Sequence, residues 1–291
     1  MHPHLSRRRF VLGSAAAVAG LAARGATPAE RKKPMWPFYA FDNGLRTIKG
    51  YEDQAKLLKD LGYVGLEYHL NHQRLPEMLE ALDTHGLELN AVYTVPWAEQ
   101  PVDPKLGDSI KLMKGRATRI EMGIRSKTFK KPSDPAGDPQ AIELMTRVSD
   151  LCGDTGPVVS VYPHAWFWTE KVDDGARLAK KIGRKNVGTN FNLVHWTWVK
   201  QSRSVEATLR DVLPHLFSVT INNGTTKGRK IYALDQGDYD LLGFLGTVKK
   251  VGYTGPVGLQ CYSVPGASEA HLKRSMAVWQ ALTKKLGVAG A

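Results

Sequence analysis

The feature that most constrains the fold is a regular alternation of short apolar runs with amphipathic segments along the chain. The apolar runs end in polar or aromatic side chains, as buried parallel strands do where they open into a site. The segments between them have apolar residues at helical spacing, and several end at glycine. The predicted strands are 38–41, 64–68, 88–94, 119–124, 158–164, 187–196, 217–222 and 257–260, and the predicted helices are 51–61, 75–85, 104–114, 139–152, 172–182, 205–213, 241–251 and 269–286.

The segment 172–182 shows the helical pattern between two of these strands. Val172, Ala176, Ala179 and Ile182 fall on one stripe of a helix, and the charged residues fall on its other faces. Such a stripe is expected to pack against a sheet. Strands 158–164 and 187–196 with this helix therefore predict a βαβ unit.

Eight such strand and helix pairs are too evenly spaced for two unrelated domains, and the chain lacks the glycine fingerprint of a dinucleotide-binding fold. A chain of 291 residues with 42% hydrophobic residues can bury one large core. The pattern predicts an α/β protein with a single (β/α)8 TIM barrel over residues 38–291. Its functional site is expected at the C-terminal ends of the strands.

The first 26 residues have the composition of an export signal. Ser6 to Leu12 (Ser-Arg-Arg-Arg-Phe-Val-Leu) resembles the bacterial twin-arginine motif, and 11–23 supplies a short apolar region. That region has about 13 residues where a membrane-spanning helix needs about 20, so we expect no stable membrane insertion after processing. Residues 27–37 are expected to form a linker, and the mature protein is expected in the periplasm or outside the cell.

The formal net charge of +12 raises the question of a nucleic-acid partner. Part of the charge comes from Arg7, Arg8, Arg9 and Arg24 in the predicted signal, and most other cationic residues are spread over helices beside acidic ones. A solvated helical surface is therefore expected, with no nucleic-acid partner. A patch that recruits an acidic substrate stays as the alternative. The oligomeric state is left open.

The two cysteines, Cys152 and Cys261, have no metal-binding spacing and cannot form a disulfide framework. They are expected to be buried free thiols.

The predicted strand ends bring together a mostly uncharged set of polar side chains. Three of them are histidines, and imidazole is the usual proton carrier near neutral pH, although a structural histidine is an equal alternative for each. Trp166, Trp168, Trp196 and Trp198 cluster in the following loops, where they could stack on a sugar ring or pack loop against loop. The set comprises Glu67, Tyr68, His69, Tyr93, Thr94, Glu121, Arg125, Tyr162, His164, Asn192, His195, Thr220, Asn222, Asn223, Gln260 and Tyr262.

Five motifs on these strands resemble one known family. Taken in order, they are similar to the xylose isomerase-like TIM barrels of the sugar phosphate isomerase/epimerase superfamily, and most of all to exported bacterial members. The resemblance implies a small-molecule carbohydrate substrate. The motifs are 61–67 (Leu-Gly-Tyr-Val-Gly-Leu-Glu), 162–164 (Tyr-Pro-His), 191–195 (Phe-Asn-Leu-Val-His), 234–240 (Leu-Asp-Gln-Gly-Asp-Tyr-Asp) and 251–260 (Val-Gly-Tyr-Thr-Gly-Pro-Val-Gly-Leu-Gln).

The chain departs from this family at the metal site. Metal-dependent members hold a divalent ion with Glu, Asp, His and Glu on strands five to eight, and these positions fall here on Tyr162, Asn192, Thr220 and Gln260. Neutral amides and hydroxyls are poor ligands for a divalent cation, and an amide cannot accept and return a proton. We therefore expect no cofactor and no family metal site. A divalent metal would need a different set of ligands.

Two classes of function remain open. In the first, the protein is an isomerase, epimerase or lyase that acts on a sugar or keto-sugar by metal-independent proton transfer. The expected catalytic residues are His195, His164 and Glu67, and the expected substrate-binding residues are His69, Tyr162, Asn192, Trp196, Asn222 and Gln260. In the second, the barrel has kept its pocket and lost its chemistry, and it binds carbohydrate without turnover.

Overall fold

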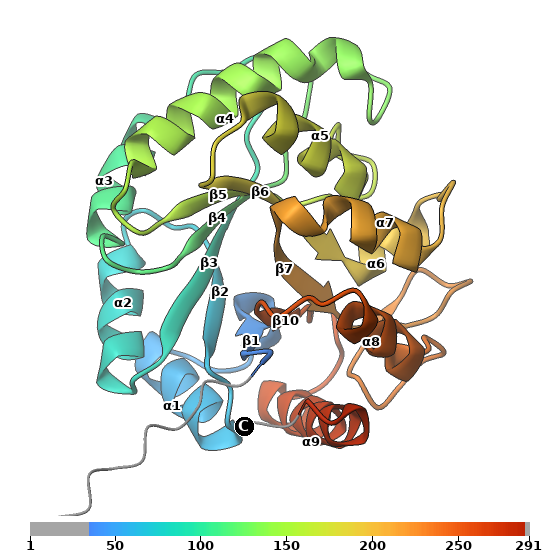
Figure 1. The fold of residues 1–291 in the computed structure, drawn as a ribbon. Helices are drawn as coiled ribbons and strands as arrows, with labels where there is room; N and C mark the ends of the chain where they lie inside the picture. The colour runs from blue at the N-terminus through green and yellow to red at the C-terminus, as the bar shows by residue number, and fades with distance from the viewer. Residues whose placement is uncertain (1–34, 289–291) are drawn as a thin grey trace, which may run out of the picture. The chain divides into compact units, whose positions relative to one another are not determined.

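The protein was analysed as a computed structural model that describes residues 35–288, in which eight parallel strands close into a barrel (Figure 1). Around the barrel the order is β1, β10, β7, β6, β5, β4, β3, β2. The predicted (β/α)8 fold is confirmed. The barrel strands are β1 (Phe38–Phe41), β2 (Gly65–His69), β3 (Glu88–Thr94), β4 (Arg119–Met122), β5 (Val158–Val161), β6 (Val187–Asn192), β7 (Leu216–Ile221) and β10 (Val257–Leu259).

The eight predicted helices are all present, and they surround the barrel in chain order (Figure 1). Their ends lie within two residues of the predicted ones, because the glycine and proline signals at the ends are local. They are α1 (Tyr51–Leu61), α2 (Leu75–Thr84), α3 (Pro104–Leu112), α4 (Asp138–Cys152), α5 (Val172–Ile182), α7 (Val205–Val212), α8 (Leu241–Lys250) and α9 (Ser268–Leu286).

Alternation along each strand divides the core into two parts. In β1, Phe38 belongs to the apolar layer between sheet and helices, and its ring stacks on Trp279 of α9 with 4.1 Å between ring centroids. Tyr39 and Phe41 form a separate cluster with Tyr162. Because successive side chains of a strand point to opposite faces, this second cluster fills the inside of the barrel.

Two local predictions need correction. Residues 193–196, expected to extend a strand and its loop, belong to a short helix, α6 (Leu193–Trp198). The side chain of Asn192 accepts a hydrogen bond from the backbone N–H of His195, and this cap turns the chain into the helix. The predicted loop 223–239 contains a small antiparallel pair, β8 (Asn223–Gly224) and β9 (Ile231–Tyr232).

The predicted stripe on α5 was partly wrong. Val172 and Ala179 are buried, whereas Ala176 and Ile182 are only half-buried. The buried face also includes Leu178 and Gly175, and a Cβ on Gly175 would lie 2.2 Å from the Oγ1 atom of Thr189 in β6. The helix backbone therefore approaches the sheet more closely than an apolar stripe alone predicts.

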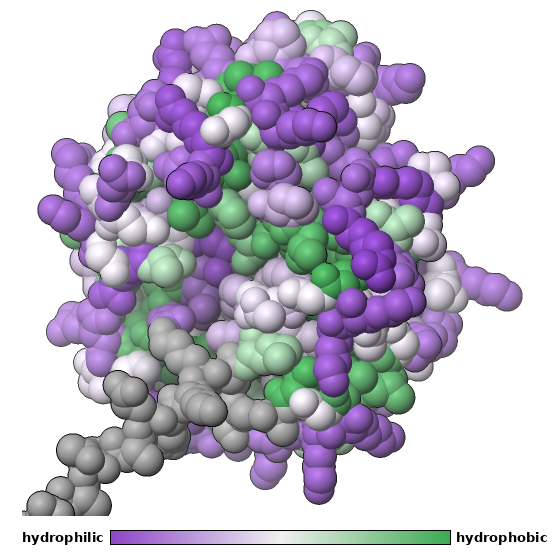
Figure 2. All heavy atoms as spheres, in the orientation of Figure 1, coloured by the Kyte–Doolittle hydropathy of each residue, from purple (hydrophilic) through white to green (hydrophobic). Residues whose placement is uncertain are grey.

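Hydrophilic side chains dominate the outline of the protein in Figure 2, and apolar residues show mainly between them. Over residues 35–288, no helix has the length and apolar character needed to cross a membrane. Both cysteines are buried and free, as predicted. The predicted export signal, residues 1–26, and most of the linker 27–37 lie outside the described residues.

Candidate active site

A cavity of about 330 Å³ opens at the C-terminal ends of the barrel strands. Three of its lining residues were predicted as catalytic, namely Glu67, His164 and His195. Its other lining residues are Phe41, Asn43, His69, Tyr93, Arg125, Tyr162, Trp166, Phe167, Trp198, Ile231, Gln260 and Tyr262. The fold thus brings these three residues to the C-terminal ends of the strands, where a TIM barrel carries its site.

The two histidines on strands five and six lie against each other in this cavity. The ring centroids of His164 and His195 are 4.0 Å apart. His164 also stacks on Phe167 at 3.9 Å, and Trp198 meets His195 edge-on at 5.8 Å. The imidazole of His195 is therefore held between aromatic rings. His195 lies on helix α6, whereas the sequence placed it at the end of the predicted strand 187–196.

Both imidazoles are neutral near pH 7. Burial, helped by the positive charge that His164 can carry, lowers the pKa of His195 well below its usual value. Burial also lowers the pKa of His164, and Arg125 acts in the same direction. Nδ1 of His164 donates to the carbonyl oxygen of Ala165 at 2.8 Å, which leaves Nε2 as the acceptor. A neutral imidazole with a free nitrogen can act as a base.

Tyr162 forms the centre of a neutral hydrogen-bond network on the cavity wall. Its hydroxyl oxygen accepts from Asn192 Nδ2 at 2.5 Å and from Gln260 Nε2 at 3.2 Å. Gln260 Oε1 in turn accepts from Asn43 Nδ2 at 2.9 Å. Because two amides already donate to the Tyr162 oxygen, its own proton is available to an acceptor in the cavity.

This network does not fit a divalent metal ion. Tyr162, Asn192 and Gln260 are the residues that the resemblance places at three of the family's four metal-ligand positions, and the hydroxyl of Tyr162 is hydrogen-bonded to both amides. The fourth position, Thr220, offers only a buried hydroxyl. Within residues 35–288, no three His, Cys, Asp or Glu side chains converge as a metal site would require.

Glu67 lies in the cavity wall, and a second carboxyl group lies behind it inside the barrel. The side chains of Glu67 and Glu121 are within hydrogen-bonding reach of each other, and both residues are at most 1% exposed. Among the described residues, no other donor reaches the Oε2 atom of either. Burial and the nearby Glu121 both oppose a negative charge on Glu67.

Three donors hold the side chain of Glu121 inside the barrel. Glu121 Oε1 accepts from Ser218 Oγ at 2.9 Å, from Asn190 Nδ2 at 3.2 Å and from Arg119 Nε at 3.4 Å. Burial and the neighbouring Glu121 raise the pKa of Glu67 well above its usual value. The protonated form of Glu67 is therefore favoured in the cavity wall.

The remaining predicted residues lie at the rim or outside the cavity. His69 lines the rim, where burial is outweighed by its hydrogen bond to Asp42 at 2.5 Å, and its pKa is raised. Asn192 does not line the cavity but donates a hydrogen bond to the hydroxyl oxygen of Tyr162. Trp196 packs on Phe191 of β6 at 5.1 Å, and Asn222 donates to the backbone oxygen of Asn223. Neither Trp196 nor Asn222 lines the cavity.

Asp42 and Asn43 were missed by the sequence analysis. Both directly follow β1, and this position was the signal that could have identified them. Asp42 accepts from the backbone and ring nitrogens of His69, and Asn43 donates to Gln260. The two residues therefore link β1 to β2 and to β10.

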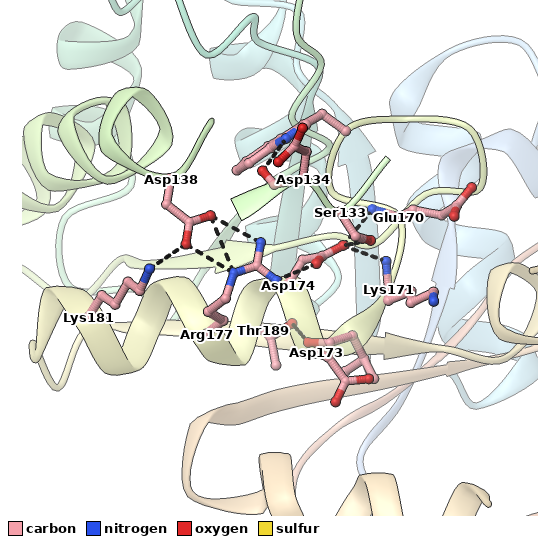
Figure 3. A network of polar contacts seen from close by, with 12 residues as sticks. Ser133, Asp134, Asp138, Glu170, Lys171, Asp173, Asp174, Arg177, Lys181 and Thr189 are labelled. Carbon is pink, nitrogen blue, oxygen red and sulfur yellow. Dashed lines mark hydrogen bonds and ion pairs between the residues drawn. The ribbon is translucent and has the colours of Figure 1, made fainter. Parts of the chain in front are cut away.

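The loop that carries His164 and Trp166 is anchored to α5 by a buried carboxylate (Figure 3). Oδ2 of Asp174 accepts from the backbone N–H groups of Glu170 and Lys171 at 2.9 Å and from Ser133 Oγ at 2.7 Å. Arg177 joins Asp174 to Asp138 on α4. Since charge-assisted bonds of this kind are the stronger ones, the loop after β5 is held in a defined position.

Comparisons with known proteins agree with this architecture. A family model described as "Xylose isomerase-like TIM barrel" matches residues 55–282. No curated protein sequence matches the chain. Among solved structures, the chain is similar to the 3-keto-D-glucoside 4-epimerase YcjR from E. coli, with 14% identity, a TM-score of 0.69 and coverage of 86% of this chain and 99% of the other.

Two further structures have comparable similarity. D-allulose 3-epimerase from Methylomonas sp. has 11% identity, a TM-score of 0.68 and coverage of 86% and 98%. The probable 3-DHS dehydratase AsbF from Bacillus anthracis has 13% identity, a TM-score of 0.65 and coverage of 83% and 98%. At these identities the likeness concerns the fold. Because the family model spans most of the chain, this protein belongs to the xylose isomerase-like TIM barrel family.

Proposed function

We propose that the protein is a sugar-modifying enzyme that moves a proton at a carbon beside a carbonyl group, without a divalent metal. The observation that carries this proposal is the placement of a neutral base and a neutral acid on one cavity. His195 supplies the free imidazole, and Glu67 supplies the protonated carboxyl group. Proteins of similar fold are named as two epimerases and a probable dehydratase, which supports a substrate of the carbohydrate class.

In the proposed step, His195 removes the proton from the carbon next to the carbonyl. Glu67 gives its proton to the carbonyl oxygen, and the electron pair of the broken C–H bond forms the enol double bond. Return of a proton to the same carbon, to its neighbour, or loss of a neighbouring hydroxyl as water would give epimerisation, isomerisation or elimination. His195 gains one positive charge and Glu67 one negative charge, so the net charge of the site does not change.

The other cavity residues have supporting roles in this proposal. Tyr162 donates its free proton to a sugar hydroxyl or to the forming enolate, and Gln260 and Asn192 hold Tyr162 in place. His164 keeps the ring of His195 in position, because the two ring centroids are 4.0 Å apart. Trp198 excludes water from one side of His195, which strengthens the hydrogen bonds that the imidazole makes.

Hydrogen exchange in heavy water tests the proposal. The purified protein is incubated in the presence of a chelator with a panel of aldoses, ketoses and 3-keto sugars, and deuterium at carbon is measured by NMR. We expect hydrogen exchange that depends on the wild-type protein. We expect no exchange with the Glu67→Gln and His195→Gln variants. Binding without exchange would favour the alternative of a carbohydrate-binding barrel without turnover, and exchange that requires added metal would contradict the proposed mechanism.

A further inference from the structure

Two arginines from distant parts of the chain lie on adjacent aromatic residues at the cavity mouth. The guanidinium of Arg125, which follows β4, lies 4.3 Å from the ring centroid of Phe167. The guanidinium of Arg229, between β8 and β9, lies 5.2 Å from the ring centroid of Trp166. Phe167 and Trp166 both line the cavity, and Trp166 is 57% exposed. Both cations therefore lie against the loop that also carries His164.

Neither arginine is neutralised by a carboxylate among the described residues. Other exposed or half-buried arginines, such as Arg74, Arg177 and Arg203, form ion pairs with acidic neighbours. Acidic residues of the neighbouring loops, among them Glu99, accept hydrogen bonds from groups other than the two arginines. Glu170 accepts from the backbone N–H of Trp166, and Asp238 accepts from Thr226.

The rest of the cavity does not supply a compensating negative charge. Among its lining residues Glu67 is the only carboxyl group, and burial and Glu121 raise its pKa. Asp42 at the rim is already paired with His69. A cavity mouth with uncompensated positive charge attracts an anion.

Stacking on an aromatic ring also prepares a guanidinium for an anion. The ring covers the face of the planar group and leaves the N–H edge free, so that a carboxylate or phosphate can accept two parallel bonds. Arg125 itself lines the cavity, and Lys127, two residues later, lies 5.2 Å from the ring centroid of Trp97 but does not line it.

We propose that the substrate is a sugar derivative with an anionic group, a carboxylate or a phosphate, which Arg125 binds at the cavity mouth with support from Arg229. The carbonyl end of the same molecule then reaches His195 and Glu67. This inference rests on the proposed function and adds the chemical class of the substrate. A neutral sugar would leave both guanidinium groups without a partner.

Calorimetric titration with matched ligands tests this inference. Each sugar of the exchange panel is compared with its uronic or aldonic acid and with its phosphate ester, for example D-glucose, D-glucuronate and D-glucose 6-phosphate. We expect at least one anionic form to bind about 10- to 100-fold more tightly than the neutral sugar. The advantage should shrink in high salt, and the stronger of the two anions identifies the group.

Three variants locate the effect. Arg125→Gln should remove most of the preference for the anion, Arg229→Gln part of it, and Lys127→Gln none, although Lys127 has the same charge and a similar aromatic contact. Equal affinity for neutral and anionic forms, or a preference that survives in Arg125→Gln, would overturn the inference. Exchange with neutral sugars would still support the proposed function in that case, and its absence with every ligand would reject both.

Discussion

The raised pKa of Glu67 has a consequence for stability. In the unfolded chain a glutamate has a pKa of about 4.3, whereas in the folded protein the pKa of Glu67 is raised. Between these two values the folded state binds one more proton than the unfolded state. The free energy of unfolding should therefore fall as pH rises, with a slope of up to about 1.4 kcal/mol per pH unit.

Glu67→Gln removes this contribution. Urea unfolding at several pH values between 5 and 8 should show the variant gaining stability relative to wild type as pH rises. The charged groups around Glu67 are Glu121, Asp42 and Arg119, and they stay in place in the variant. Glu143→Gln, an exposed partner of Arg147, serves as control and should follow wild type in parallel. A parallel curve for Glu67→Gln would show that Glu67 is ionised in the folded protein.

His195 is the second residue whose role can be measured directly. Because it is 4% exposed and packed between rings, His195→Ala should lower the melting temperature, whereas His195→Gln keeps part of the volume and polarity. Both variants should lose sugar affinity by about 1.5–3 kcal/mol. Their exchange rate should fall about a hundredfold or more. Normal exchange by a folded His195→Gln variant would transfer the role of base to His164.

At the scale of the element, the contact between α5 and β6 depends on Gly175. A Cβ at this position would lie 2.2 Å from Thr189 Oγ1 and 2.8 Å from Val161 Cβ, and the strands cannot move without disturbing the barrel. Gly175→Ala should therefore cost about 1–3 kcal/mol of stability, as overpacked cores do.

Gly246 provides the matched control for this prediction. It also lies inside a helix, α8, but its Cβ would meet nothing closer than Leu286 Cδ2 at 3.8 Å. Gly246→Ala should raise stability by up to about 1 kcal/mol, because alanine loses less backbone entropy than glycine. Differential scanning calorimetry of both variants gives the comparison. Equal effects would mean that α5 does not pack as closely as described.

For the whole molecule, the neutral network at the family's metal positions predicts that folding and binding do not need a divalent ion. The protein purified in chelator should keep its melting temperature and its affinity for sugar. Elemental analysis should find no stoichiometric metal. One tightly held ion per chain would show that ligands other than Tyr162, Asn192, Thr220 and Gln260 form a site.

The export signal is a second prediction for the whole chain. We propose that residues 1–26 direct the folded protein through the twin-arginine route to the periplasm. Replacing Arg7 and Arg8 by lysine should leave the precursor in the cytoplasm, which cell fractionation and immunoblotting can measure. An undiminished periplasmic level of the double variant would contradict the proposal. The wild-type chain expressed at the same level is the control.

The order and type of the barrel elements could be predicted from the sequence because they depend on local patterns. The apolar run 187–192 and the stripe that begins at Val172 are visible without knowledge of any distant residue. The even spacing of the strand and helix pairs argued against two unrelated domains. The resemblance to the xylose isomerase-like family indicated which of the family's metal ligands are replaced in this chain. These features need only short-range periodicity and chain length.

The chemistry of the site was decided by tertiary structure. Glu121 raises the pKa of Glu67 only because barrel closure brings β2 and β4 to the same interior, and Arg125 lies against Phe167 only because two loops converge. Trp196 looked equivalent to Trp198, yet the turn of α6 sends one toward Phe191 and the other toward His195. Burial, ionisation and side-chain direction depend on contacts between residues distant in sequence, which local patterns do not contain.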